Sequence, residues 1–240
     1  QPAGADALRY LHKRGLTDET IDEFRIGYSM PGWSSLLEMA GRRGFPASAL
    51  ELAGLVLQSR KGRGHYDRFR DRVIFPITNL SGRAIAFGAR ALRMDDEPKY
   101  LNSPETPIYH KSGVLYGMSH ARDAIRRQDT AIVVEGYMDV VSLAQGGVGN
   151  VVASSGTALT APHARLLARY AERVVLLFDG DAAGSTAAQR GVEVLLGTEL
   201  DTRIVTLPTG QDPDSFERRD QGADELRQLI DEEKLKLIAV

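Results

Sequence analysis

Apolar positions in the second half of the chain gather in four short runs, with helical patterns between them. The runs are AIVVE, GNVVAS, RVVLLFD and TRIVTLP, and the stretches MDVVSLAQ, APHARLLARYA and AAGSTAAQRGVEVLL lie between successive runs. Strands that are apolar on both sides and alternate with helices indicate a parallel sheet covered on both faces. We therefore expect an α/β domain over residues 131–215, joined to the preceding part by the polar stretch 126–130.

The first part of the chain, residues 1–130, has the pattern of a mixed α+β subdomain. Short helical stretches come first, among them one with Leu8 and Leu11 at helical spacing and one with Thr17 as its N-cap candidate. The segments VIFPIT and GRAIAFGAR then predict a β-hairpin, and a long loop rich in Pro, Gly, Asn and Ser follows. Residues 216–240 return to a helical pattern, which predicts the start of a further helical subdomain.

Composition narrows the classes of protein to which the chain can belong. It has 240 residues, 42% of them hydrophobic, which is enough for a real core. The lack of cysteine excludes disulfides, thiolate zinc sites and cysteine nucleophiles. No apolar run reaches the roughly 18 residues of a membrane span, which indicates a cytoplasmic protein without a membrane partner. The chain starts without methionine and ends within a helical pattern, so we expect a fragment of a longer protein.

The net charge of −2 hides a basic block at residues 60–72, where six basic and two acidic residues give a local charge of +4. Within this block Arg68, Arg70 and Arg72 alternate, and residues two apart in an extended segment share one face. Such a face suits the phosphates of a single strand or of an RNA–DNA hybrid. The alternative is a charged strand that is only solvated.

Acidic residues follow several of the predicted strands. Glu135 closes the first strand, Asp179 and Asp181 close the third, and Asp212 and Asp214 lie just beyond the fourth. Parallel strands with right-handed crossovers all end at one edge, so these five carboxylates should lie on one rim. Oxygen ligands without His or Cys suit Mg²⁺ or Mn²⁺, and a pair of such ions assists reactions at phosphodiesters.

The competing interpretation of these acids is local. An Asp at the end of a strand is, taken alone, more often a helix cap or a turn former than a metal ligand. Five acids on one rim favour the metal site. Asp139 differs from them, because it falls in the opening turn of the first helix, where an acid complements the helix dipole. Its role stays uncertain.

A few other residues carry weaker predictions. We expect Trp33 to pack in the helical layer, and His110 and His163 to be satisfied surface histidines. The Gly- and Ser-rich stretch GNVVASSGTALT lies at a strand end and could hold a phosphate at the start of the next helix.

The motifs EGYMDV, FDGDAAG and DPDSF resemble the acidic motifs of TOPRIM domains, a fold shared by bacterial primases, type IA and type II topoisomerases and some nucleases. Upstream, YDRFRDRVIFPI, GRAIAFGAR and PKYLNSPETPIYHKSGVLYG resemble the catalytic core of DnaG-type bacterial primases. The resemblance implies a TOPRIM parallel sheet flanked by helices. It also implies the synthesis of short RNA primers on single-stranded DNA from ribonucleoside triphosphates.

The same resemblance implies roles for individual residues. Glu135, Asp179 and Asp181 would be catalytic, and together with Asp212 and Asp214 they would bind Mg²⁺ or Mn²⁺. Nucleotide contacts are implied for a set of charged, amide and tyrosine residues: Arg90, Lys99, Tyr100, Asn102, Lys111 and Tyr137. The residues that would bind nucleic acid are Arg68, Arg70 and Arg72.

The implied partners are a single-stranded DNA template, an RNA–DNA hybrid and ribonucleoside triphosphates, bound by a monomer at the replisome in the bacterial nucleoid. Full-length family members also carry a zinc-binding and a helicase-binding domain. Neither is recognisable in this sequence, so we expect the replicative helicase to bind only through a domain outside it. Two other functions stay open: a TOPRIM nuclease or topoisomerase-like DNA cleavage domain, and a non-catalytic nucleic-acid or nucleotide-binding module.

Overall fold

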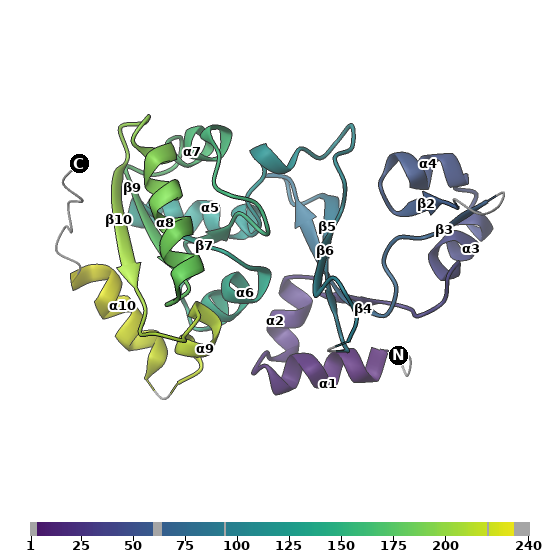
Figure 1. Cartoon of the computed structure of the whole chain (residues 1–240), viewed down its shortest axis with the longest axis horizontal. Coiled ribbons are helices and arrows are strands. Elements are labelled where there is room, and N and C mark those ends of the chain that lie inside the picture. Colours follow the sequence, from purple (N-terminus) through teal and green to yellow (C-terminus); the bar gives the residue numbers. More distant parts are fainter. Residues whose placement is uncertain (1–3, 60–63, 94, 220, 233–240) are drawn as a thin grey trace. The chain divides into compact units, whose positions relative to one another are not determined.

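The computed structural model describes residues 4–59, 64–93, 95–219 and 221–232 (Figure 1). The chain folds into two compact units. Unit 1 comprises Gln1–Ile77 and Arg83–His110, and unit 2 comprises Thr78–Gly82 and Lys111–Val240. Each unit has its own β-structure and its own buried residues, and each is described by itself.

Unit 1 opens with the short helices that the sequence predicts. Their bounds are Ala5–Lys13 (α1), Asp18–Glu23 (α2), Ser35–Arg42 (α3) and Ala47–Leu52 (α4). The predicted cap of α2 is confirmed, because the Thr17 side chain accepts a hydrogen bond from the backbone N–H of Thr20 at 3.3 Å. In α1 the buried positions are Ala7 and Leu11, four residues apart, whereas Leu8 is exposed.

Antiparallel strands form the rest of unit 1. The bounds are Gly27–Ser29 (β1), Val56–Gln58 (β2), His65–Asp67 (β3), Arg72–Thr78 (β4), Ala84–Ala91 (β5) and Tyr100–Asn102 (β6). One sheet has the order β1-β4-β5-β6, and β2 pairs with β3 in a second, two-stranded sheet. The predicted hairpin is therefore confirmed, since β4 and β5 are neighbours. The long loop after β5 is partly regular, because β6 pairs with β5.

Unit 2 is built on the predicted parallel sheet. Its strands are Thr130–Val134 (β7), Val151–Ala153 (β8), Arg173–Phe178 (β9) and Asp201–Thr206 (β10), in the order β10-β9-β7-β8. Each neighbouring pair is parallel. The side chains of β7 and β8 are buried along their whole length, as the continuous apolar runs require.

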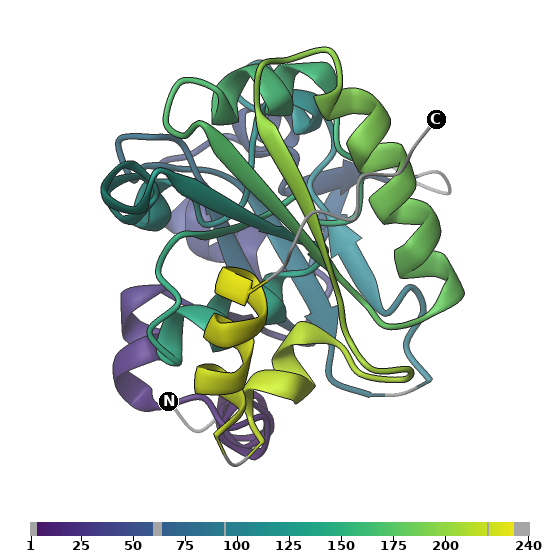
Figure 2. The same ribbon diagram turned by 90° about the vertical axis from the view of Figure 1, so that its left-hand side faces the viewer.

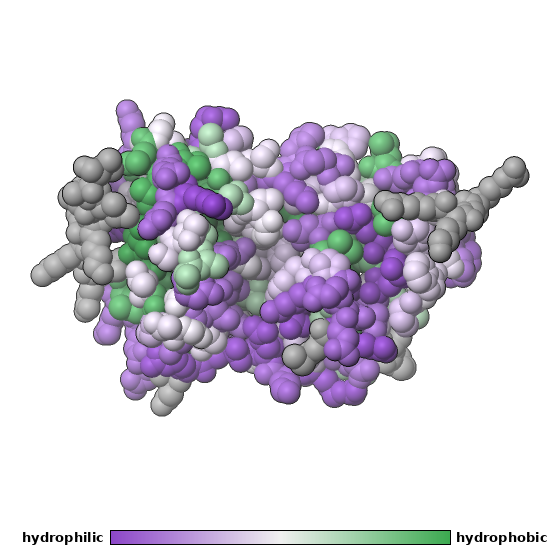
Figure 3. Space-filling view, viewed as in Figure 1, coloured by the Kyte–Doolittle hydropathy of each residue, from purple (hydrophilic) through white to green (hydrophobic). Residues whose placement is uncertain are grey.

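Helices cover this sheet. They are Met118–Gln128 (α5), Tyr137–Gln145 (α6), Ala161–Leu167 (α7), Ala182–Leu195 (α8), Pro213–Glu217 (α9) and Gly222–Glu232 (α10), and Lys111–Gly113 forms a 3-10 turn (η2). Figure 2 shows the strands side by side with α8 along the sheet. One buried cluster joins α5, α7 and α8 to side chains of β7, β8 and β9. Hydrophobic residues also reach the surface around α8 and β10, at the edge of the sheet (Figure 3).

The division of the structure differs from the boundary that we expect after residue 130. Residues 111–130 belong to unit 2, because Met118, Ala121 and Ile125 of α5 are buried in the same cluster as β7 and β9. The expected join at 126–130 is instead the end of α5 and the first residue of β7. The helical pattern expected after residue 215 is present in α9 and α10, and residues 233–240 lie outside the described residues.

The order of the strands creates a switch point between β7 and β9. From β7 the chain crosses over through α6 to β8 on one side, whereas from β9 it crosses through α8 to β10 on the other side. Ligands of open parallel sheets bind outside the carboxyl ends of two strands that diverge in this way. Among the described helices, none has the length and apolar character needed to cross a membrane.

Candidate functional site

The predicted acids surround the switch point. Glu135 follows β7 directly and Asp179 follows β9 directly, so the two strands that diverge each end in a carboxylate. Asp181 comes two residues later, where α8 begins. The sheet alone brings these three residues to one edge, although up to 46 positions of sequence separate them.

The Glu135 carboxylate lies in a partly buried and electrostatically unfavourable place. Its Oε1 is buried and has no hydrogen-bond partner among the described residues. Burial raises the pKa of Glu135, the negative charge of Asp181 raises it further, and a hydrogen bond from the backbone of Asp179 acts in the opposite direction. An acid in this situation binds a proton or a cation more readily than a solvated one.

Asp179 and Asp181 are held by close backbone packing. The Asp181 side chain caps α8, since its Oδ1 accepts a hydrogen bond from the backbone N–H of Gly184 at 2.8 Å. A Cβ on Gly184 would lie 2.2 Å from the backbone oxygen of Asp179, and one on Gly180 would lie 2.3 Å from that of Pro208. Asp179 and Asp181 line a cavity of about 290 Å³ beside α8.

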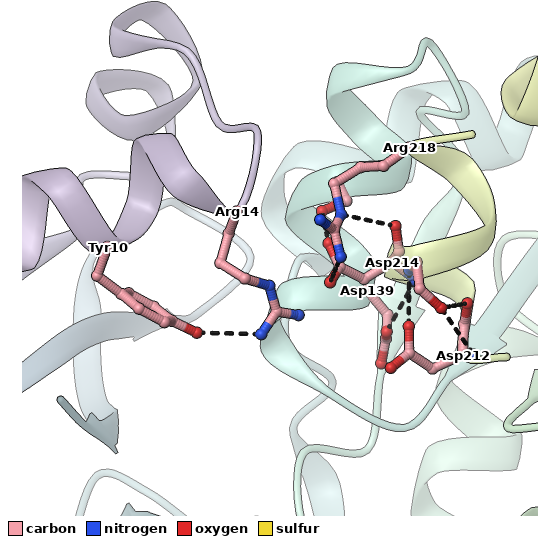
Figure 4. A network of polar contacts seen from close by, with 8 residues as sticks. Tyr10, Arg14, Asp139, Asp212, Asp214 and Arg218 are labelled. Carbon is pink, nitrogen blue, oxygen red and sulfur yellow. Dashed lines mark hydrogen bonds and ion pairs between the residues drawn. The ribbon is translucent and has the colours of Figure 1, made fainter. Parts of the chain in front are cut away.

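A second group of acids is joined by hydrogen bonds (Figure 4). Asp139 accepts from the backbone N–H of Gly136 at 2.9 Å and from that of Asp214 at 3.2 Å. Asp212 caps α9 by accepting from the backbone N–H of Ser215 at 2.6 Å. Asp139 therefore connects the first turn of α6 to the loop that carries the last two acids.

Asp214 is the most buried member of this group, with 1% of its surface exposed. Ser142 of α6 donates a hydrogen bond to its Oδ1, and Arg218 forms an ion pair with its Oδ2 at 3.2 Å. These contacts give Asp214 a structural role between α6 and α9. Of the acids beyond the fourth strand, Asp212 is the more accessible.

The charges of the two groups act on each other. The pKa of Asp139 is raised to about 7, first by burial and then by the neighbouring carboxylates Asp179, Asp212 and Asp214, whereas the hydrogen bond from Gly136 lowers it. Charges from two separate segments, the one after β9 and the one after β10, thus act on Asp139. It also explains why Asp139 is difficult to assign from sequence, since it is both a helix-start residue and a member of the cluster.

The described residues contain no ready-made group of three His, Cys, Asp or Glu side chains that would hold a metal ion. Their chemistry nevertheless fits a hard cation. The buried Oε1 of Glu135 is without a partner in the described part of the chain, and burial, together with the charges of neighbouring carboxylates, raises the pKa of Glu135 and Asp139. A divalent cation with oxygen ligands would offset both effects.

The structure corrects the predicted arginine face. Residues 68–71 are not part of a strand, and Asp71 has a φ of 51°, so the alternation along RFRDR is interrupted. Arg72 is 7% exposed and donates to the backbone oxygen of Pro98 at 2.7 Å. Arg68 donates to the backbone oxygen of Asn102 at 2.9 Å, and burial lowers its pKa. The preceding basic residues Arg60, Lys61 and Arg63 lie outside the described residues.

Arg70 contacts two aromatic side chains instead, and one of them, Trp33, was not among the predicted site residues. Its guanidinium lies 4.2 Å from the ring centroid of Trp33 and 5.5 Å from that of Tyr66. Trp33 is 66% exposed, so the expectation that it packs in the helical layer is wrong. Trp33 and Tyr66 meet edge to face, with centroids 5.6 Å apart. We call Trp33, Tyr66 and Arg70 the aromatic platform; the signal in the sequence is a tryptophan in the turn PGW.

Four of the predicted nucleotide contacts belong to unit 1. Lys99 and Tyr100 are exposed neighbours, with the Lys99 Nζ 5.9 Å from the Tyr100 ring centroid. The backbone oxygen of Asn102 receives the hydrogen bonds of Arg68. Arg90 lies over the ring of Tyr10, at 4.3 Å, and donates to the backbone oxygen of Ala91.

The other two predicted nucleotide contacts, Lys111 and Tyr137, belong to unit 2. Tyr137 is buried against Tyr116, with ring centroids 4.8 Å apart, so its ring has no open face for a base. Stacking by Tyr137 is therefore not supported.

Lys111 lies in η2, and its backbone oxygen accepts from Nε2 of His163 at 2.9 Å. His163 is fully buried, which corrects the expectation of a surface histidine, and burial lowers its pKa.

Models of known protein families match both parts of the chain. A family model described as "DNA primase catalytic core, N-terminal domain" matches residues 1–122, and one described as "Toprim-like" matches residues 132–217. The DNA primase of Synechococcus elongatus is 44% identical over 238 residues, which are 96% of this chain and 34% of that protein. The chain thus spans about a third of the length of such curated relatives.

Solved structures agree with these matches. A crystal structure of a DNA primase domain from Pseudomonas aeruginosa has a TM-score of 0.88 and 45% identity, and covers 95% of this chain and 71% of that one. A structure of the DnaG primase catalytic domain bound to single-stranded DNA has a TM-score of 0.87 and 43% identity, and covers 96% and 72%.

Proposed function

This chain belongs to the DNA primase catalytic core family, and we propose that it synthesises short RNA primers on a single-stranded DNA template. The primer would be built from ribonucleoside triphosphates. The chain spans about a third of the length of its curated relatives. The activity, the substrates and the partners are therefore stated as proposals.

The observation that carries the proposal is the meeting of acids at the switch point of unit 2. Glu135, Asp179 and Asp181 leave two diverging strands at one edge, and Glu135 keeps a buried oxygen without a partner among the described residues. These three residues, with Asp212, are the proposed ligands of Mg²⁺ or Mn²⁺. When bound, such an ion would offset the charge of the carboxylates and of a nucleoside triphosphate.

The proposed reaction is nucleotidyl transfer. The 3′-hydroxyl oxygen of the growing RNA attacks the α-phosphorus of the incoming nucleotide, the bond to the β-phosphate breaks, and pyrophosphate leaves. The hydroxyl proton must pass to a base. Glu135 is the proposed acceptor, because its oxygen has no competing hydrogen bond in the described structure and burial raises its pKa.

Template binding is proposed for the aromatic platform of unit 1. The exposed ring of Trp33 and the partly exposed ring of Tyr66 offer stacking faces to unpaired bases, and Arg70 supplies positive charge beside them. The related DnaG catalytic domain was solved bound to single-stranded DNA, and that of Mycobacterium tuberculosis with a double-stranded DNA oligomer. Of the predicted arginine face, Arg70 is thus the member best suited to a template contact.

Nucleotide binding is proposed for the exposed residues of the long loop. Lys99 suits triphosphate oxygens, and Tyr100 offers a stacking face. Arg90, Asn102 and Lys111 remain candidates for further polar contacts. The proposed product is an RNA–DNA hybrid. We propose that the protein acts as a monomer at the replisome and that the helicase binds only through a domain outside these residues.

The test is a polymerisation assay with single-stranded DNA, the four ribonucleoside triphosphates and Mg²⁺ or Mn²⁺. We expect extended RNA, and a loss of at least about 100-fold in Glu135→Gln and Asp179→Asn. Asp22→Asn, which changes an exposed acid on α2, should act as the parent does. Nicked or degraded DNA without RNA would instead favour a nuclease or topoisomerase-like domain. If both acidic variants retained full activity, a non-catalytic binding module would be the better interpretation.

A further inference from the structure

Unit 2 contains a second cavity at the carboxyl ends of its strands, distinct from the one that Asp179 and Asp181 line. Its volume is about 260 Å³. Its lining includes Glu135 after β7, Ser154 after β8 and Phe178 at the end of β9. Ala187 and Arg190 of α8 also line it. Glu135 therefore lines this cavity, whereas Asp179 and Asp181 line the other one.

The loop after β8 forms a further wall of this cavity and is fixed to Glu135. The backbone N–H of Ser155 donates to the backbone oxygen of Glu135 at 3.1 Å. Thr157, which lines the cavity, donates from Oγ1 to the backbone oxygen of Ser154 at 3.0 Å. The loop keeps this shape through two residues in the left-handed region, Ser155 with φ 51° and Gly156 with φ 81°. The wall is thus formed before any ligand binds.

Among the described residues that line the cavity, Arg190 is the single basic side chain. It is exposed, and within the described part of the chain it makes no hydrogen bond or ion pair. It lies nine positions after Asp181 in α8, which corresponds to a rise of about 13.5 Å along the helix axis. The backbone of Arg190 therefore lies well inside α8, away from the end of the helix that Asp181 caps.

These groups define the chemistry of a ligand. The buried Oε1 of Glu135, without a partner among the described residues, calls for a hydroxyl donor, and the guanidinium of Arg190 calls for an anion such as a phosphate. A ribose with its 5′-phosphate carries both groups within one small unit. Pockets that enclose whole small molecules measure roughly 300–1,000 Å³, so this cavity suits the sugar and phosphate and leaves the base outside.

We propose that this cavity binds the sugar and phosphate of the ribonucleotide that carries the attacking 3′-hydroxyl, with the hydroxyl at Glu135 and the phosphate at Arg190. The proposal rests on the primer-synthesis function and adds the location of the acceptor end of the RNA. It assigns Arg190 and the loop 154–157 to the acceptor, whereas Lys99 and Tyr100 are proposed for the incoming triphosphate.

The first test measures binding without catalysis. Adenosine 5′-monophosphate and adenosine are titrated into the protein by calorimetry in buffer with EDTA, so that no metal contributes. We expect Arg190→Ala to weaken binding of the monophosphate roughly tenfold and to leave adenosine unaffected, with partial rescue in Arg190→Lys. Arg165→Ala, an exposed arginine of α7 outside the cavity, is the matched control. Equal monophosphate affinity in the parent and Arg190→Ala would overturn the proposal.

The second test separates the acceptor from the incoming nucleotide. In extension of a preformed RNA primer on DNA, Arg190→Ala should raise the KM for the primer roughly tenfold and leave the KM for the triphosphate unchanged. A raised KM for the triphosphate alone would refute the assignment. If the parent made no RNA but its monophosphate binding still depended on Arg190, the cavity assignment would stand and the proposed function would fail.

Discussion

At the scale of single residues, the acids of unit 2 divide into those that cap helices and those that do not. Asp181 and Asp212 each cap a helix, as the local interpretation predicts, yet each caps with one carboxylate oxygen. A carboxylate has a second oxygen, so capping does not exclude metal binding. Glu135 caps no described helix and retains a buried oxygen without a partner in the described residues. The two interpretations of the acids are therefore compatible.

Asp139 leads to a prediction about pH. Its pKa is about 7 in the folded protein against 3.8 for an ordinary aspartate, so the folded state binds the proton more tightly than the unfolded chain. Protonation then stabilises the fold, and the free energy of unfolding should fall as the pH rises from about 4 to 7. A difference of about three pKa units corresponds to at most about 4 kcal/mol. Above pH 7 this contribution no longer changes.

Urea unfolding of the metal-free protein between pH 4 and 8 measures this dependence. We expect Asp139→Asn to show a clearly flatter profile over that range, because the variant lacks the carboxyl group of Asp139. Asp22→Asn should keep the profile of the parent, since that acid is exposed. Identical profiles in the parent and Asp139→Asn would show that Asp139 is not the group responsible.

Trp33 leads to a prediction about DNA. Stacking of a base on an aromatic ring contributes about 1–3 kcal/mol, so Trp33→Ala should weaken binding of single-stranded DNA by about 5- to 150-fold. Fluorescence anisotropy with a labelled oligonucleotide measures the effect. Phe45→Ala removes another exposed aromatic ring of unit 1, 57% exposed, and should leave the affinity unchanged. An equal loss in both variants would argue against a specific platform.

At the scale of elements, the start of α8 is a part that close packing constrains. The helix must approach β9 closely enough for Asp181 to cap it while Asp179 remains at the strand end. Only glycine fits at position 184, because a Cβ there would overlap the backbone oxygen of Asp179. The motif DGDAAG thus combines acids for chemistry with a glycine for close approach.

A matched pair of glycine substitutions tests this constraint. Gly41 lies within α3, and a Cβ there would meet nothing within 4 Å, so Gly41→Ala should stabilise the protein by about 0.5–1 kcal/mol. Gly184→Ala should instead destabilise it by about 1–3 kcal/mol and lower the metal-dependent activity, because Asp179 must move. Urea unfolding gives both values. A stabilising Gly184→Ala would contradict the close packing.

At the scale of the whole molecule, the two units are not divided where the change of pattern occurs. The parallel pattern begins at residue 131, but α5 before it supplies Met118, Ala121 and Ile125 to the buried cluster of the sheet. The backbone oxygen of Leu80 also accepts a hydrogen bond from Arg122 of α5, at 2.7 Å. The sheet of unit 2 therefore needs residues that precede its first strand.

Two fragments test the boundary. Residues 111–240 should unfold cooperatively in urea, whereas residues 131–240 should lose cooperative unfolding or most of their stability. The reason is that each large apolar side chain of α5 contributes about 1.5–3 kcal/mol by burial. Circular dichroism at 222 nm follows the transition. Equally stable fragments would place the boundary at residue 130 after all.

The sequence by itself determined the parallel sheet, the hairpin, the cap of α2 and the edge at which the acids meet. These features follow from periodicity, capping chemistry and the handedness of crossovers, which act over short stretches or apply to all such sheets. The resemblance of the acidic motifs to TOPRIM domains agrees with the Toprim-like match over residues 132–217. The family was therefore accessible without coordinates.

Only the tertiary structure decided which side chains are exposed. Trp33 is at the surface while Tyr137 and His163 are buried, because burial depends on elements that are distant in sequence and pack against each residue. One left-handed residue, Asp71, separates arginines that alternate in the sequence. The cavity beside Glu135 likewise depends on the ends of three strands and on α8, so Arg190 acquires its proposed role through packing that no local pattern encodes.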